Sequence, residues 1–351
     1  MGFFLGVQMN ADKKRIYIAY TGGTIGMKKS PNGYVPVAGY ITDVVNSLTE
    51  LHRPEMPEFD IHEYSPVLDS SNMTPKDWQT IAEDIQANYQ DYDGFVVLHG
   101  TDTMAYTASA LSFMLKDLNK PVIVTGSQIP LSEIRSDGQL NLLNSLYLAA
   151  HYPVAEVGLF FNNQLYRGNR TTKADSTGFN AFESPNCAPL ISAGIHIDVN
   201  EGKVLDKVNN AENKGLTIID IKEQPIGVVS LYPGISHLVI KNILAQPVNA
   251  LIIQSYGVGN APEDPELLKE IQNANDRGIL VVNRTQCHRG MVNMDGYATG
   301  HALKDAGVLS AHDMTLEACL TKVHHLLSQD LPFNEVRARF VENLKGELTA
   351  V

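Results

Sequence analysis

The sequence predicts a two-domain α/β protein in which sheets of mainly parallel strands are covered by helices. Apolar runs of strand length alternate with amphipathic helical segments in both halves of the chain. A length of 351 residues is more than one hydrophobic core usually serves. A polar stretch at residues 200–223 separates the halves and predicts a connection between domains. We therefore expect an N-terminal extension (1–12), a larger N-terminal α/β domain (13–199) and a smaller, Rossmann-like α/β domain (224–351).

The larger domain begins with repeated strand–helix units. Strands buried on both faces are apolar almost throughout, and this pattern occurs at 15–20 after Arg15, at 94–98, and at 121–125 up to Thr125. Amphipathic helices are expected at 74–89, 103–116 and 138–150. Strands at 157–161 and 165–166 flank Asn162-Asn163-Gln164, which is typical of a hairpin. Repeated units of this kind favour a mainly parallel sheet.

The smaller domain shows the same alternation on a smaller scale. A short strand is expected within the connection, at 216–221. Further strands are expected at 226–231, 250–254 and 279–283. Helices are expected at 265–275, 315–327 and 334–344.

The composition argues against several classes of protein. A net charge of −12 argues against binding to nucleic acid or to an anionic membrane. No apolar stretch is long enough to span a bilayer, and the apolar run within residues 1–9 is too short for a secretory signal. Three cysteines form no disulfide framework and fit a reducing compartment. We therefore expect a cytoplasmic protein.

The first chemistry-bearing turn, Thr21-Gly22-Gly23-Thr24, follows the strand expected at 15–20. Its glycines let the backbone bend sharply and approach a ligand closely. A threonine hydroxyl becomes a nucleophile once a base removes its proton. The polar, glycine-bearing stretch that follows has the composition of a mobile loop, from which Tyr34 would reach Thr24. A strand-ending turn with an incidental threonine explains this run equally well.

The second such turn, His99-Gly100-Thr101-Asp102-Thr103, leads into the helix expected at 103–116. Asp and Thr are favoured at helix N-termini, so capping alone explains Thr101 and Asp102. Catalysis needs a base as well, and a lysine whose pKa is lowered by burial can act as one. Lys173 is the candidate, oriented by Asp102, and an ordinary solvated lysine is the alternative. Because ligands bind at the carboxyl ends of parallel strands, we expect both turns to share one site.

A third polar turn, Asp69-Ser70-Ser71, lies between a strand-like segment (59–64) and the helix expected at 74–89. Its side chains suit a small zwitterion, and the same residue types also lead helices. The histidines show no metal-ligand spacing. We therefore expect neither a metal site nor a cofactor.

Taken together, these runs resemble the bacterial-type L-asparaginases, in particular the cytoplasmic type I branch. Thr-Gly-Gly-Thr-Ile-Gly (21–26) and Leu-His-Gly-Thr-Asp-Thr-Met (98–104) match the two family signatures in order and at matching spacing. Val-Thr-Gly-Ser-Gln-Ile-Pro (124–130) and Ser-Tyr-Gly-Val-Gly-Asn (255–260) extend the resemblance, which covers about residues 13–344. The resemblance implies hydrolysis of L-asparagine to L-aspartate and ammonia.

The resemblance also implies roles for individual residues. Thr24 corresponds to the family's nucleophile, with Tyr34 as its phenol partner. Thr101, Asp102 and Lys173 correspond to a second, buried triad. Contacts to the substrate are implied for Gly23, Asp69, Ser70, Ser71, Gly100, Thr101 and Asp102. We expect Thr24 to attack the amide and Thr101 to position the substrate or water.

Family membership further implies a homo-oligomer, a dimer or a tetramer. Some type I relatives have a second, regulatory asparagine site, and Thr172, Gln254 and Cys287 stand where that site would be. An arginine is expected at position 254 to bind the effector carboxylate, and glutamine does not supply that charge. For Cys287 the alternative is a buried apolar filler.

Two alternatives to a strict asparaginase remain. One is a broader asparaginase and glutaminase, because one methylene in an apolar pocket is discriminated by only about 1–3 kcal/mol. The other is a non-catalytic amino-acid sensor on the same scaffold, since a fold does not determine a function. The presence of all five catalytic-type residues favours an enzyme over a sensor.

Overall fold

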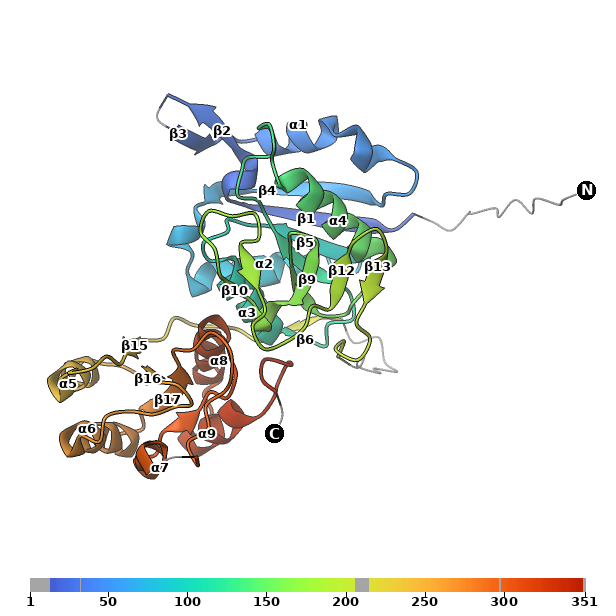
Figure 1. Ribbon diagram of the computed structural model, residues 1–351. Coiled ribbons are helices and arrows are strands. Elements are labelled where there is room, and N and C mark those ends of the chain that lie inside the picture. The colour runs from blue at the N-terminus through green and yellow to red at the C-terminus, as the bar shows by residue number, and fades with distance from the viewer. Residues whose placement is uncertain (1–12, 32, 206–214, 297, 350–351) are drawn as a thin grey trace, which may run out of the picture.

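The computed structural model describes residues 13–31, 33–205, 215–296 and 298–349. These residues form two α/β domains, each built on its own sheet (Figure 1). The larger, mainly parallel N-terminal sheet and the smaller C-terminal parallel sheet confirm the predicted fold class. The expected extension (1–12) lies outside the described residues, as does part of the expected connection, residues 206–214.

The larger sheet has eight strands in the order β13-β12-β9-β8-β7-β5-β1-β4. Five of them run parallel, from β4 to β8, and β9, β12 and β13 pair antiparallel at the other edge. The strands are β1 (Arg15–Gly22), β4 (Glu58–Leu68), β5 (Gly94–Leu98), β7 (Val122–Thr125), β8 (Val157–Phe161), β9 (Gln164–Arg167), β12 (Ile191–Ala193) and β13 (Ile197–Val199). The central strands read as apolar runs because helices cover both of their faces.

Four helices cover the two faces of this sheet in pairs. One apolar core joins the sheet to α1 (Tyr40–Ser47) and α4 (Gly138–His151). The other core joins it to α2 (Pro75–Ala87) and α3 (Met104–Met114). The first residues of α2 match the expected start, with Thr74 as N-cap and proline in the first turn.

The larger domain also contains several shorter elements. Three small antiparallel pairs are β2 (Met27–Ser30) with β3 (Gly33–Pro36), β6 (Leu115–Lys116) with β14 (Thr217–Ile218), and β10 (Thr172–Lys173) with β11 (Phe182–Glu183). Short 3₁₀ turns are η1 (Thr24–Gly26), η2 (Thr49–His52), η3 (Ser70–Asn72) and η4 (Gly168–Arg170).

The smaller domain has a four-stranded parallel sheet with helices on both faces. Its strands are β15 (Ile226–Ser230), β16 (Ala250–Ser255), β17 (Leu280–Thr285) and β18 (Leu309–Ser310). One core contains α5 (His237–Ala245), α6 (Pro265–Asp276) and α7 (Ala298–Asp305). The other contains α8 (Leu316–Leu327) and α9 (Phe333–Val341), and α8 packs against α3 of the larger domain.

The structure differs from the sequence prediction in a few elements. Helices α1, α5 and α7 were not expected, because α1 and α5 are short and each has only two buried apolar residues, four apart. The stretch after Thr24, expected to be a mobile loop, contains the β2–β3 hairpin, and its mobility stays a prediction. In the part of the chain that the structure describes, no helix is long and apolar enough to cross a membrane.

Candidate active site

Three glycine-containing or polar turns meet at the carboxyl ends of the neighbouring strands β1, β4 and β5. A Cβ atom added to Gly22 would lie 1.9 Å from the Leu68 carbonyl oxygen, and one added to Gly23 would lie 2.4 Å from Gly100 Cα. Both glycines also have positive φ angles, 142° and 92°. Only glycine allows this approach, and it brings the turn that carries Thr24 against the turn that carries Thr101.

Lys173 contacts both Thr101 and Asp102. Its Nζ donates to Thr101 Oγ1 at 2.9 Å and to Asp102 Oδ1 at 2.7 Å. The Lys173 side chain is 19% exposed, and the Asp102 side chain is 67% exposed at the mouth of the site. The N-cap of α3 is Thr103, and neither Thr101 nor Asp102 caps that helix. The alternatives of a capping pair and of a freely solvated lysine are therefore wrong.

A third side chain, Gln128, also contacts Thr101. The Thr101 hydroxyl donates to Gln128 Oε1 at 3.0 Å, and Gln128 Nε2 donates to the Gly178 carbonyl at 3.1 Å. Because a hydroxyl has one proton, Thr101 accepts from Lys173 while it donates to Gln128. Gln128 lies within the signature at 124–130, but its sequence position gives no sign that it faces Thr101.

Thr24 and Tyr34 are not joined by a hydrogen bond in this structure. Thr24 begins η1 and is half-buried, whereas Tyr34 lies on β3 of the hairpin and is 45% exposed. The hairpin extends from the edge of the larger domain (Figure 1). Tyr34 must therefore move with the hairpin if its phenol is to reach Thr24.

The turn Asp69-Ser70-Ser71 packs against the other two turns. Ser70 is buried, and a Cβ added to Gly100 would lie 2.4 Å from its Oγ. Asp69 Oδ1 accepts from the Ser71 hydroxyl at 2.7 Å and from the Ser71 N–H at 3.0 Å. These hydrogen bonds lower the pKa of the Asp69 carboxyl. An ionised carboxylate therefore lies at the edge of the site, although the same contacts also cap η3.

His99, which sequence reasoning did not select, supports the turn that carries Thr101. It is fully buried, and its Nδ1 donates to the Gly100 carbonyl at 2.7 Å. Thr107 Oγ1 lies 2.8 Å from His99 Nε2 and accepts from Trp78 Nε1 at 3.1 Å. Burial lowers the pKa of His99 to about 4, so the ring is neutral and the Thr107 hydroxyl donates to Nε2. The network holds the carbonyl of Gly100 in one orientation.

Of the expected regulatory residues, Thr172 precedes Lys173 and contacts the smaller domain, and Gln254 lies on β16 of that domain. Thr172 Oγ1 donates to Glu317 Oε1 at 2.7 Å, and Arg284 Nη1 donates to Gln254 Oε1 at 3.2 Å. Arg284 pairs with Gln254 on the adjacent parallel strand. It therefore places a guanidinium next to position 254, where the expected arginine is absent. Burial raises the pKa of Glu317 despite the Thr172 hydrogen bond. Cys287 is exposed, so its interpretation as a buried filler is wrong.

Comparisons with known proteins match both domains of the chain. Residues 15–205 match the family model for the N-terminal domain of asparaginase, and residues 225–340 match that for the glutaminase/asparaginase C-terminal domain. L-asparaginase 1 of Escherichia coli (strain K12) is 63% identical over 338 residues, which cover 96% of this chain and 98% of that protein.

A 60 kDa lysophospholipase of Homo sapiens is 40% identical over 359 residues, which cover 96% of this chain and 62% of that protein. The crystal structure of L-asparaginase I from Vibrio cholerae O1 biovar eltor str. N16961 is similar with a TM-score of 0.89 at 60% identity. That match covers 96% of this chain and 100% of the other.

Proposed function

This chain belongs to the asparaginase family, and we propose that it hydrolyses the side-chain amide of L-asparagine to give L-aspartate and ammonia. The observation that carries the proposal is the contact of Lys173 Nζ with both Thr101 Oγ1 (2.9 Å) and Asp102 Oδ1 (2.7 Å). This contact lies beside the turn of Thr24, at the edge of the sheet where ligands of parallel α/β folds bind. The site thus offers two hydroxyls and an ammonium around one small space.

In the proposed first step, Thr24 Oγ1 attacks the amide carbon of the substrate. Its proton passes by way of the Tyr34 phenol to the amide nitrogen, which leaves as ammonia, and an aspartyl ester of Thr24 remains. Tyr34 reaches this position when the hairpin closes over the substrate and excludes water. Backbone N–H groups of the glycine turns stabilise the oxyanion, and each such donor is typically worth about 10²–10³ in rate.

In the proposed second step, water adds to the ester carbon, and the C–O bond to Thr24 breaks. The threonine hydroxyl recovers a proton and L-aspartate is released. Thr101, released from Gln128, positions this water, the Lys173 ammonium orients the Thr101 hydroxyl, and the proton that the water loses passes to Thr24 Oγ1 as the threonine leaves. Asp102 holds the lysine in place through the 2.7 Å contact.

The proposed selectivity for an amino acid arises from the charged groups around the turns. The ionised Asp69 carboxylate and the exposed Asp102 carboxylate attract the α-ammonium group of the substrate. The hydroxyl and N–H groups of the turn at residues 69–71 suit its α-carboxylate.

Ammonia release from L-asparagine, with L-glutamine in parallel, tests the proposed function. We expect ammonia from asparagine and little from glutamine. Equal turnover of both would favour the broader asparaginase and glutaminase. Binding of asparagine without ammonia release by folded protein would contradict hydrolysis and favour the sensor.

We also propose a regulatory asparagine site at Thr172, Gln254 and Cys287, with Arg284 binding the effector carboxylate in place of the expected arginine at position 254. The hydrogen bond from Arg284 to Gln254 supports this assignment, because it keeps a guanidinium at that position. The family relationship is likewise the basis for proposing a homodimer or homotetramer.

A further inference from the structure

Lys173 lies at the end of a buried segment that forms hydrogen bonds and ion pairs with several distant parts of the chain. The three residues of η4, Gly168–Arg170, are all buried. Thr171, which is also buried, donates its hydroxyl to the Arg167 carbonyl at 2.8 Å. Strand β10, which contains Lys173, follows directly. The contacts that hold η4 therefore also fix the backbone position from which the Lys173 side chain extends.

Arg170 connects this segment to the smaller domain. Its Nη1 and Nη2 donate to the two carboxylate oxygens of Asp313, at 3.0 and 2.8 Å. The two side chains are only 4% and 6% exposed. Burial tends to raise the pKa of Asp313, but hydrogen bonds from Arg170 and Thr349 outweigh it and lower the pKa. The pair is therefore a buried, bidentate ion pair between the domains.

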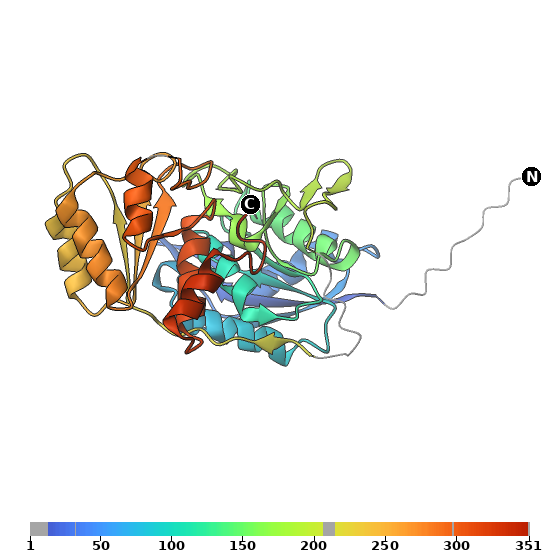
Figure 2. The ribbon, with the colours of Figure 1, turned by 90° about the horizontal axis from the view of Figure 1, so that it is seen from below.

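The last described residues of the chain complete the shell around Arg170. We call residues 343–349 the C-terminal segment; Figure 2 shows the end of the chain returning to the larger domain. Arg170 Nη1 donates to the Glu347 carbonyl at 2.8 Å, and Thr349 Oγ1 donates to Asp313 at 2.6 Å. Asn169 Nδ2 donates to the Lys345 carbonyl at 3.0 Å. The segment is itself anchored by the fully buried ion pair of Glu347 with Lys322.

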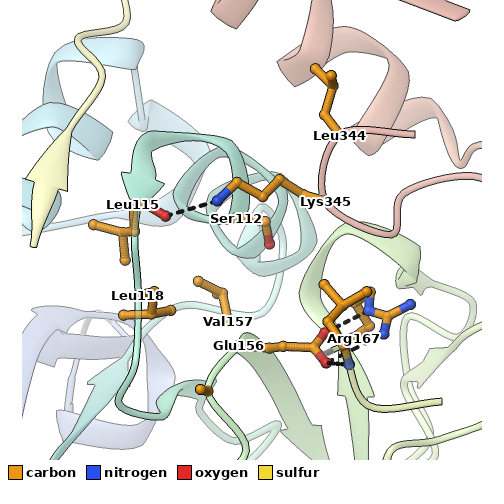
Figure 3. Close-up of a pocket in the computed structure, with 10 residues that line it drawn as sticks. Ser112, Leu115, Leu118, Glu156, Val157, Arg167, Leu344 and Lys345 are labelled. Atoms are coloured by element: carbon orange, nitrogen blue, oxygen red, sulfur yellow. Dashed lines mark hydrogen bonds and ion pairs between the residues drawn. The ribbon is translucent and has the colours of Figure 1, made fainter. Parts of the chain in front are cut away.

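A second arginine holds the start of the same run. Arg167 forms a buried ion pair with Glu156 at 2.6 Å, and its Nη1 donates to the Gly346 carbonyl at 3.4 Å. Figure 3 shows this pair lining a pocket that Leu344 and Lys345 of the C-terminal segment also line. Two arginines three residues apart thus attach the run before Lys173 to the C-terminal segment.

Successive residues of a strand point to opposite sides. In β10, Thr172 contacts Glu317 of the smaller domain, whereas Lys173 contacts Thr101 and Asp102. Arg170, in η4 just before this strand, also contacts the smaller domain, at Asp313. We propose that Arg170, held by Asp313 and the C-terminal segment, is a positioning residue for Lys173. It fixes the backbone from which the ammonium reaches both partners of the triad. The inference rests on the proposed function, because it requires Lys173 to take part in turnover.

A double-mutant cycle on the full-length protein tests this proposal. Arg170→Lys keeps a positive charge but loses the bidentate geometry. Because a misplacement of 1 Å can cost about 10² in rate, we expect this variant to lower kcat about tenfold with KM little changed. In the Lys173→Met background, Arg170→Lys should lower kcat by less than about twofold, because the two residues act through one group.

Additive losses in the double variant would overturn the inference and leave the proposed function intact. Unchanged kcat in Arg170→Lys, with only a lower melting temperature, would also overturn it, since Arg170 would then merely join the domains. Full turnover by Lys173→Met would overturn the proposed role of the lysine as well.

Arg337→Lys is the matched control. Arg337 also bridges two segments, at Asn275 Oδ1 (2.6 Å) and the Gly307 carbonyl (2.8 Å), but all three lie within the smaller domain. The kcat of Arg337→Lys should equal that of the parent protein. A loss of kcat in Arg337→Lys as large as that in Arg170→Lys would contradict a specific role for Arg170. If Arg170→Lys does not fold, Thr349→Ala tests the proposal in its place. A roughly twofold loss of kcat that disappears in the Lys173→Met background supports the proposal, and an unchanged kcat overturns it.

Discussion

Replacing Gly23 by alanine is expected to lower kcat about 100-fold. The new Cβ would lie 2.4 Å from Gly100 Cα and N and 2.8 Å from the His99 carbonyl carbon, whereas ordinary contacts begin at 3.4 Å. All three neighbours are backbone atoms, so none can rotate away. The turn of Thr24 must therefore move about 1 Å from that of Thr101, and a displacement of this size can cost about 10² in rate.

Ammonia release and thermal unfolding of the same preparations measure the two consequences separately. Gly278→Ala is the control, because Gly278 also has a positive φ, 81°, but a Cβ there would meet nothing within 4 Å. Gly278→Ala adds roughly 1–2 kcal/mol of backbone strain, and Gly23→Ala adds roughly 1–3 kcal/mol because its φ of 92° and ψ of 172° lie in a region essentially restricted to glycine. Only Gly23→Ala should lose turnover. Turnover of Gly23→Ala within about twofold of the parent protein would refute the argument that these two turns share one site.

Three further predictions follow from the site and its surroundings. Thr24→Ala, Thr101→Ala and Lys173→Met should each lower kcat about 10²-fold or more, and near-normal ammonia release would remove that residue from the mechanism. Acidification from about pH 6.5 to 4 should destabilise the fold, because burial lowers the pKa of His99 and His325 to about 4 while unfolded histidine titrates near 6.5. The unfolded chain binds more protons in that window, so each ring lowers the free energy of unfolding by up to about 1.4 kcal/mol per pH unit of acidification. A free energy of urea unfolding that does not change with pH there would contradict this prediction. Arg284→Gln should convert a sigmoidal dependence of velocity on asparagine into a hyperbolic one, and a parent protein that is already hyperbolic at several enzyme concentrations would exclude the regulatory site.

The sheet and the turns could be predicted from the sequence because their signals are local. The run at 94–98 has no polar side chain and that at 15–20 has only aliphatic residues and tyrosine after Arg15, and only strands covered on both faces need such a pattern. Glycine after such a strand marks a turn whatever the rest of the chain does. Helix α5 gave a weaker signal, because it is only nine residues long and buries only Ile240 and Leu244.

The contacts between side chains were decided by the tertiary structure. Lys173 lies 72 residues from Thr101 in the sequence, and nothing local to either residue specifies their contact. Gln128, His99 and Arg170 look like ordinary polar residues until the fold supplies their partners from other segments. The sequence by itself therefore determined the strands, the turns and the residue types available for chemistry. Only the packing of distant segments decided which of these groups lie within hydrogen-bonding distance, because that distance depends on the whole fold.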